Sequence, residues 1–154
     1  MAIIILDFDG TVVKHEFPLI GEDIGAVPVL KELVSNGHKL VLFTMRSDVV
    51  DPDSEDIEIT CQPGMYLSEA VQWFSDNDIP LYGIQKNPTQ HTWTSSPKAY
   101  GNLIIDDAGL GIPLVMPVEG VDEWRPYVDW YKVRLLLTDM LWINKNPGNK
   151  PGFL

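Results

Sequence analysis

The chain of 154 residues is poor in cysteine, in basic residues and in long apolar runs. Its single cysteine, Cys61, excludes a disulfide within the chain and fits a reducing compartment, so we expect a cytoplasmic protein. Apolar runs such as 3–6 and 40–43 are far too short to cross a membrane, and no signal-peptide pattern precedes the first run. With 11 basic against 22 acidic residues, the net charge of −11 disfavours binding to long nucleic acid.

The composition that remains is typical of one folded domain. Hydrophobic residues make up 45% of the chain and charged residues 21%, which is ordinary for a globular protein with a single core. We therefore expect one domain over residues 1–143. The last segment, 144–154, is rich in Asn, Lys, Pro and Gly, and we expect it to be a disordered tail.

The most informative segment lies near the start of the chain. Residues 3–6 form an apolar run that is typical of a buried strand in a parallel sheet. Asp7 and Asp9 follow where that strand would end, and Gly10 lets the chain turn sharply. Ligands of open α/β sheets bind just beyond the carboxyl ends of the strands. Two carboxylates so close together repel each other unless a cation or a proton lies between them, so they indicate a hard metal ion and a phosphorylated substrate.

The rest of the chain alternates between strand and helix patterns. Expected strands lie near 2–7, 39–44, 81–84, 103–106 and 114–116, and expected helices lie near 25–36, 64–77 and 122–143. The polar stretch 47–63 is typical of a solvated loop. This order predicts an α/β fold, namely a three-layer, Rossmann-like parallel sheet with helices on both faces.

The final predicted helix carries apolar residues on more than one face. We expect Asp122 to be its N-cap and Pro126 to lie in its first turn. A helix of this kind is usually buried on more than one face. It either packs deep in the core or forms the interface of a homodimer.

Four motifs, in order along the chain, resemble those of the haloacid dehalogenase superfamily, most of whose members are Mg²⁺-dependent phosphatases. The motifs are Asp7-Phe8-Asp9-Gly10-Thr11-Val12, Leu42-Phe43-Thr44, Lys98, and Leu103-Ile104-Ile105-Asp106-Asp107. The connections 11–39 and 45–97 hold too few residues for an inserted cap domain. The chain therefore resembles a capless member of the superfamily, whose active site would be open to solvent.

This resemblance implies a role for each acid. Asp7 would be the nucleophile that forms an aspartyl-phosphate. Asp9 would protonate the leaving group and then activate water. Asp7, the main-chain carbonyl of Asp9, Asp106 and Asp107 would hold Mg²⁺, which prefers oxygen ligands.

Two further side chains would complete the catalytic set. Thr44 would donate its hydroxyl to a phosphoryl oxygen, and Lys98 would balance the charges of the nucleophile and the phosphate. Lys86, at the end of a predicted strand, competes with Lys98 for that role.

We expect substrate contacts from residues that directly adjoin the motifs. These candidates are Gly10, Thr11, His15, Met45 and Arg46. Two of them have an alternative interpretation. His15 could be a solvent-exposed loop residue, and Arg46 could form a surface ion pair with acidic residues of the 48–56 loop instead of binding an anionic group of the substrate.

Taken together, the motifs predict a Mg²⁺-dependent phosphatase, a hydrolase that acts on a phosphomonoester of small-molecule size. Two alternatives stay open. Similar cores act as nucleotidases or polynucleotide-end phosphatases, although the acidic balance disfavours long nucleic acid. A chain with these acids could also be a non-catalytic module that binds Mg²⁺ and phosphate.

Overall fold

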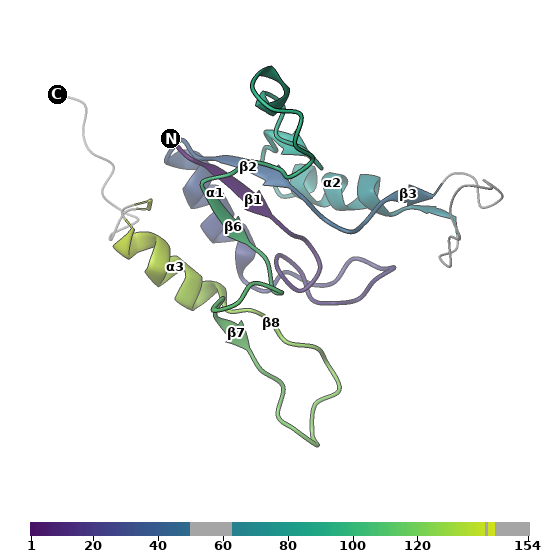
Figure 1. Cartoon of the computed structure of the whole chain (residues 1–154). Helices are drawn as coiled ribbons and strands as arrows, with labels where there is room; N and C mark the ends of the chain where they lie inside the picture. Colours follow the sequence, from purple (N-terminus) through teal and green to yellow (C-terminus); the bar gives the residue numbers. More distant parts are fainter. Residues whose placement is uncertain (50–62, 141, 144–154) are drawn as a thin grey trace.

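The computed structural model describes residues 1–49, 63–140 and 142–143, and its centre is a four-stranded sheet (Figure 1). The strands are β1 (Ile3–Leu6), β2 (Lys39–Leu42), β5 (Gly83–Ile84) and β6 (Leu103–Ile105), in the order β5-β2-β1-β6. Every pairing between neighbours in this sheet is parallel. The α/β fold with a parallel sheet is thus confirmed.

The register brings the ends of three strands level. Leu6, the last residue of β1, lies opposite Leu42 of β2 and Ile105 of β6. The residues that follow each strand therefore leave the sheet at the same edge. This places Asp7 and Asp106 on neighbouring strands at the carboxyl end of the sheet, where open α/β sheets bind their ligands.

Three α-helices pack against the sheet, and their apolar residues share one core with it. The helices are α1 (Ala26–Ser35), α2 (Tyr66–Asp76) and α3 (Trp130–Asp139). The Asp23 side chain accepts hydrogen bonds from the backbone N–H of Ala26 and Val27, which satisfies the first turn of α1. At the other end of α1, Gly37 has a φ of 84°, a left-handed conformation that commonly ends helices and that glycine adopts easily.

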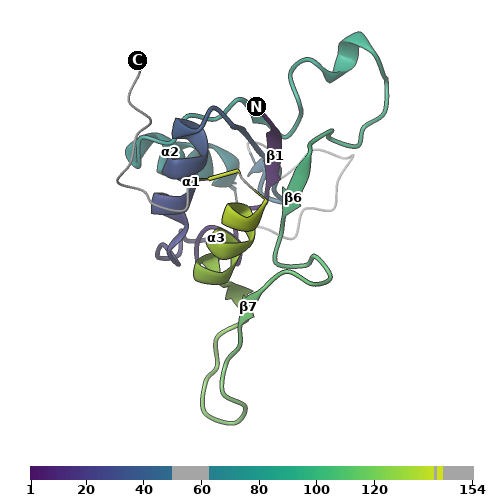
Figure 2. The same ribbon diagram turned by 90° about the vertical axis from the view of Figure 1, so that its left-hand side faces the viewer.

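All three helices lie on the same face of the sheet. Ile4 and Leu6 belong to the large core that includes residues of α1, α2 and α3, whereas Ile5 on the other face belongs to a small cluster with Val41 and Ala99. Figure 2 shows α1 and α2 to one side of β1 and β6. Among the described residues, the prediction of helices on both faces is therefore not confirmed.

The strand order explains this one-sided arrangement. The crossovers from β1 to β2 and from β2 to β5 move in one direction across the sheet, and right-handed crossovers put both α1 and α2 on one face. The connection from β5 to β6 moves in the opposite direction and so crosses the other face. That connection contains a short 3-10 helix, η1 (Gln90–Thr92), and no α-helix. Ile104 of β6 consequently keeps 55% of its surface exposed.

The prediction of a final helix over 122–143 was wrong for its first turns. Tyr127–Val128 forms strand β8, which pairs antiparallel with β7 (Leu114–Val115), and the long hairpin between them extends away from the sheet (Figure 1). The N-cap of α3 is Asp129, whose side chain accepts from the Lys132 backbone N–H, rather than Asp122. Pro126 explains the difference, because a proline disfavours helical conformation in the residue before it.

Other elements differ less from the expectations. The second strand ends at Leu42 rather than residue 44. Part of the expected polar loop forms strand β3 (Asp48–Val49), which pairs antiparallel with β4 (Gly64–Met65), the first two residues of the expected helix 64–77. Cys61, the expected tail 144–154 and most of the acidic 48–56 loop lie outside the described residues. The absence of a cap domain stays a prediction. No described helix has the length and apolar character needed to span a membrane.

Candidate active site

The turn after β1 sets the geometry of the site. The backbone N–H groups of Thr11, Val12 and Val13 all donate to the Phe8 carbonyl, which folds the chain back directly after Asp7. Gly10 has a φ of 77° in this turn. A Cβ atom at Gly10 would overlap the His15 ring and would lie 2.7 Å from Oδ2 of Asp107, so a larger residue would push both side chains away.

Three carboxylates converge beside this turn. Asp7, Asp106 and Asp107 each offer one oxygen, and these oxygens lie within 4.8 Å of one another. We call these three residues the acid cluster. Its donors are hard oxygen ligands, which suit a hard divalent cation such as Mg²⁺. The acid cluster could therefore bind a metal ion.

Asp7 has a perturbed acidity in the metal-free protein. Burial raises the pKa of Asp7 to about 7 from its ordinary value of 3.8, with further increases from the charges of Asp106 and Asp107. Hydrogen bonds from the Phe8 backbone and the Thr11 side chain work in the opposite direction and lower this pKa. A nearby cation would favour the ionised form of Asp7, so this environment is suited to a bound metal ion.

The Thr11 hydroxyl positions the acid cluster. It donates to Oδ2 of Asp7 at 3.1 Å and accepts from the Asp107 backbone N–H at 3.0 Å. Thr11 is fully buried, and its carbonyl accepts a 2.6 Å hydrogen bond from the Trp130 indole. The structure therefore places Thr11 behind the carboxylates, and not in the substrate contact predicted for it.

His15 lies beside the acid cluster rather than out in solvent. Its Nε2 lies 2.9 Å from Oδ2 of Asp107, and its side chain is only 14% exposed. The solvent-exposed alternative for His15 was therefore wrong. Through this contact His15 can orient Asp107.

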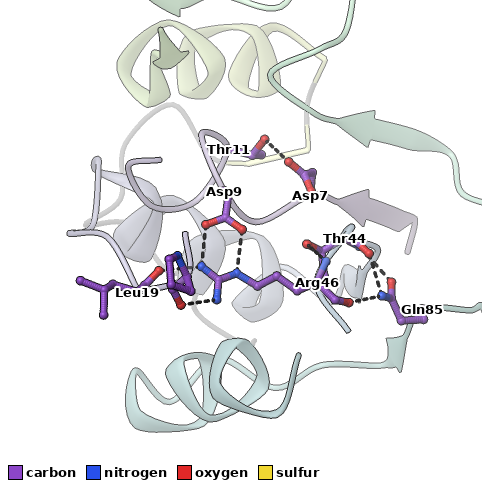
Figure 3. Close-up of polar contacts among 8 residues, drawn as sticks. Asp7, Asp9, Thr11, Leu19, Thr44, Arg46 and Gln85 are labelled. Carbon is purple, nitrogen blue, oxygen red and sulfur yellow. Dashed lines mark hydrogen bonds and ion pairs between the residues drawn. The ribbon is translucent and has the colours of Figure 1, made fainter. Parts of the chain in front are cut away.

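The Asp9 carboxylate pairs with Arg46, whereas the Asp7 carboxylate points to Thr11 (Figure 3). Arg46 donates from Nε to one oxygen of Asp9 and from Nη2 to the other, both at 2.7 Å. The Arg46 side chain is only 1% exposed. Arg46 is therefore buried rather than part of a surface ion pair, so that alternative was wrong. Its contact with an anionic group of the substrate stays a prediction, since Arg46 also lines the open cavity described below. The main-chain carbonyl of Asp9 stays a predicted metal ligand.

Thr44 is held at the end of β2 by a residue that sequence reasoning missed. The Gln85 side chain accepts from the Thr44 backbone N–H and donates to the Thr44 and Arg46 carbonyls. The Thr44 hydroxyl oxygen accepts from the Arg46 backbone N–H at 3.2 Å. The sequence offers one indirect signal for Gln85, namely its position directly after the third strand, at the same edge as the acids.

An open cavity of about 540 Å³ joins most of these residues. It is lined by Asp7, Asp9, His15, Phe17, Thr44, Met45, Arg46, Asp106, Asp107, Ala108 and Arg125. The predicted contact residue Met45 is almost fully exposed there. Sequence reasoning missed Phe17 and Arg125, the latter because residues 122–129 were expected to be helical. The residue before a proline is usually extended, and this was the available signal for Arg125.

The structure distinguishes the two lysine candidates. A second cavity, of about 190 Å³, is lined by Lys98 together with Asp7 and Asp106. Lys86 lines a separate cavity beside Asn87 that contains no member of the acid cluster. Lys98 is therefore the candidate that lies next to the acids.

Comparisons with known proteins support the fold. No family model and no curated protein matches the chain. A solved structure of a conserved protein coded by a locus from Bacteroides thetaiotaomicron is similar, with a TM-score of 0.64 and 28% sequence identity. The match covers 90% of this chain and 91% of that chain. That protein is described only as conserved, so the similarity assigns no activity.

Proposed function

We propose that the protein is a Mg²⁺-dependent phosphatase of the haloacid dehalogenase type, which hydrolyses phosphate compounds through an aspartyl-phosphate on Asp7. The observation that carries the proposal is the acid cluster, whose oxygens lie within 4.8 Å of one another at the carboxyl end of the sheet. Two acids from the end of β6 and one from the end of β1 form a hard, oxygen-rich site beside an open cavity.

Each residue has a role in this proposal. Asp7, Asp106 and Asp107 hold the cation, and the bound cation neutralises charge on the transferred phosphoryl oxygens. Asp7 attacks phosphorus with the carboxylate oxygen that remains free. Thr44 offers its hydroxyl to a phosphoryl oxygen, and the Lys98 ammonium balances the charge of the nucleophile and the phosphate. Arg125 lines the open cavity and adds a further positive charge there.

The first test is hydrolysis of 4-nitrophenyl phosphate with and without Mg²⁺. We expect turnover by the wild type only with Mg²⁺, and no turnover by Asp7→Asn at any Mg²⁺ concentration. Asp139→Asn, the same chemical change at an exposed position of α3, is the matched control and keeps wild-type turnover. Equal turnover by Asp7→Asn and the wild type would refute the covalent mechanism.

A second variant separates metal binding from nucleophilic attack. Asp106→Asn removes one cation ligand but leaves the nucleophile, so excess Mg²⁺ restores part of its turnover, while Asp7→Asn stays inactive. Mass spectrometry of the wild type quenched in acid should find a phosphoryl group on the peptide that contains Asp7. Calorimetry that detects phosphate binding with Mg²⁺ but no turnover would instead favour a non-catalytic binding module.

A further inference from the structure

Two arginines line the open cavity beside the acid cluster, and they differ in their partners. Arg46 donates two hydrogen bonds at 2.7 Å to the Asp9 carboxylate, and its side chain is only 1% exposed. Arg125 is exposed, and within the part of the chain that the structure describes no carboxylate forms an ion pair with it. The positive charge of Arg125 is therefore available to an anion that enters the cavity.

The main chain directly after Arg125 is fixed to the turn that follows β1. The Val128 backbone N–H donates to the Gly10 carbonyl at 2.9 Å, which ties the base of the β7–β8 hairpin to this turn. Pro126 follows Arg125, and the residue before a proline is restricted to extended conformations. The backbone of Arg125 is therefore held at a defined place beside the cavity, although no described carboxylate holds its guanidinium.

The remaining exposed wall of the cavity is largely apolar. The side chains of Phe17 and Met45 line it, and these two residues are 47% and 98% exposed. A substrate whose phosphoryl group lies at the acid cluster would meet this apolar surface and the Arg125 guanidinium with its other parts. Ligand sites commonly combine an apolar lining with a few polar groups that fix orientation and specificity.

We propose that Arg125 binds a second anionic group of the substrate, so that the protein selects phosphate esters whose leaving group has an apolar body and carries a further negative charge. This inference rests on the proposed phosphatase function. The second anionic group is a carboxylate or another phosphate, because the planar guanidinium offers paired N–H donors that match both.

The position of Arg125 separates it from the groups that hold the transferred phosphoryl group. Arg125 forms no ion pair with any member of the acid cluster, whereas a phosphoryl group bound to the cation must lie next to the ligands of that cation. Lys98 lines a cavity together with Asp7 and Asp106 and supplies positive charge there. Loss of Arg125 should therefore affect substrates unequally, according to the charge of their leaving group.

The test compares three phenyl phosphates in the presence of Mg²⁺. Two of them, 3-carboxyphenyl phosphate and resorcinol bisphosphate, carry a second anionic group, and 3-carbamoylphenyl phosphate is the neutral analogue. The ratio of the kcat/KM values of an anionic probe and the neutral probe measures selectivity. We expect the wild type to prefer at least one anionic probe, and Arg125→Gln to reduce this ratio by about 5- to 50-fold, between the effects of an exposed ion pair and a charge-assisted hydrogen bond. The two anionic probes distinguish a carboxylate from a phosphate as the preferred group.

Two further variants control for the loss of charge. Lys31→Gln removes one positive charge at an exposed position of α1, outside the cavity, and should keep the wild-type ratio. Arg125→Lys keeps the charge but loses the paired donors, so its ratio should lie between those of the wild type and Arg125→Gln. Added salt should lower the ratio in the wild type more than in Arg125→Gln, because salt screens an interaction between exposed charges.

Each contrary outcome has a defined meaning. A wild type that prefers neither anionic probe overturns the inference, and so does a ratio that Arg125→Gln leaves unchanged. An equal loss for all three probes in Arg125→Gln also overturns it, because Arg125 would then act on the transferred phosphoryl group or on the fold. Absence of turnover for every probe overturns the proposed function itself, so the two failures are distinguishable.

Discussion

Asp7 makes the metal-free fold sensitive to pH. Burial raises its pKa to about 7 in the folded protein, against 3.8 in the unfolded chain. Between these values the folded protein keeps a proton that the unfolded chain has lost, so stability falls as pH rises from about 3.8 to about 7. Above about pH 7 Asp7 is ionised in both states, and the loss of folding stability caused by its burial then has its full value.

Replacing Asp7 by Asn should remove that penalty. In the presence of EDTA at pH 8, we expect Asp7→Asn to be more stable than the wild type by about 4 kcal/mol, and to differ little from it near pH 4. Urea denaturation at both pH values measures this difference, with Asp139→Asn as the control. Mg²⁺ at pH 8 should raise the stability of the wild type more than that of the variant. A variant less stable than the wild type at pH 8 would contradict the assigned burial cost.

Thr11 offers a second prediction for a single residue. Thr11→Val keeps the shape of the side chain but removes the hydroxyl that bridges Asp7 and the Asp107 backbone. We expect a loss of about 1–3 kcal/mol in stability, and roughly 10–100-fold weaker Mg²⁺ binding because two cluster residues lose their orientation. Calorimetric titration with Mg²⁺ measures the affinity. Thr11→Ser, which keeps the hydroxyl, should stay within a few-fold of the wild type.

Some residues of the candidate site could be predicted from the sequence, and others could not. Asp7 and Asp106 were predictable because each directly follows an apolar strand, and parallel strands end at a common edge. The pairing of Asp9 with Arg46 could not be predicted from the sequence, because it joins residues 37 positions apart through one side-chain conformation. Arg46 becomes buried only once Phe8 and Phe17 pack around it, and no local pattern encodes that packing.

At the level of secondary-structure elements, Gln85, which directly follows β5, holds the loop after β2 in place. Gln85 has a φ of 59°, which is unusual for a residue other than glycine, and its side chain holds Thr44 and Arg46. Backbone strain of this kind persists where the surrounding contacts fix it. The β5 edge is therefore a structural support for the phosphate-contacting loop proposed at Thr44.

Two substitutions separate the strain at Gln85 from its hydrogen bonds. Gln85→Ala removes the hydrogen bonds but keeps the strain, so we expect a loss of about 1–3 kcal/mol in stability. Gln85→Gly also removes the hydrogen bonds but relieves the positive φ, and should be more stable than the alanine variant by about 1 kcal/mol. Both should reduce turnover, because Thr44 loses its support. Thermal unfolding ranks the variants, and equal stability of the two would contradict the strain argument.

Element boundaries were predictable where local chemistry decides them. The start of α1 near Asp23 and its end at Gly37 follow from side-chain capping and from glycine conformation. The β7–β8 hairpin was not foreseen, because Trp124 and Tyr127 gave the segment an apolar, helix-like composition. In the structure these two rings lie 5.2 Å apart and belong to the hairpin. Tertiary packing of Trp130 against the turn after β1 fixes where α3 begins.

At the scale of the whole molecule, the α-helices among the described residues cover only one face of the sheet. The connection from β5 to β6 leaves Ile104 and Trp93 more than half exposed on or near the other face. The alternation of strands and helices could predict the parallel sheet, but not this asymmetry, because the layer above each face depends on strand order. Strand order is decided by long-range pairing, which is not visible in any one segment.

Helix α3 carries a second group of apolar side chains that no described segment covers. Val133 and Leu137 pack into the core, while four large apolar side chains on the two flanks of the helix are exposed. These are Tyr131, Leu135, Leu136 and Met140. Residues four apart lie on the same side of a helix, so Tyr131 lies beside Leu135 and Leu136 beside Met140, with the polar Lys132 and Asp139 between the two pairs. We call Leu136 and Met140 the α3 patch. An exposed patch of this kind is typical of an interface.

We predict that two copies of the chain associate through the α3 patch. The wild type should sediment as a homodimer at micromolar concentration, and Leu136→Lys should sediment as a monomer, because a buried unpaired ammonium opposes association. Leu110→Lys makes the same change at a fully exposed leucine outside α3 and should stay dimeric. Analytical ultracentrifugation distinguishes these outcomes. A wild type that is monomeric at every concentration, or a Leu136→Lys variant that stays dimeric, would refute association through α3.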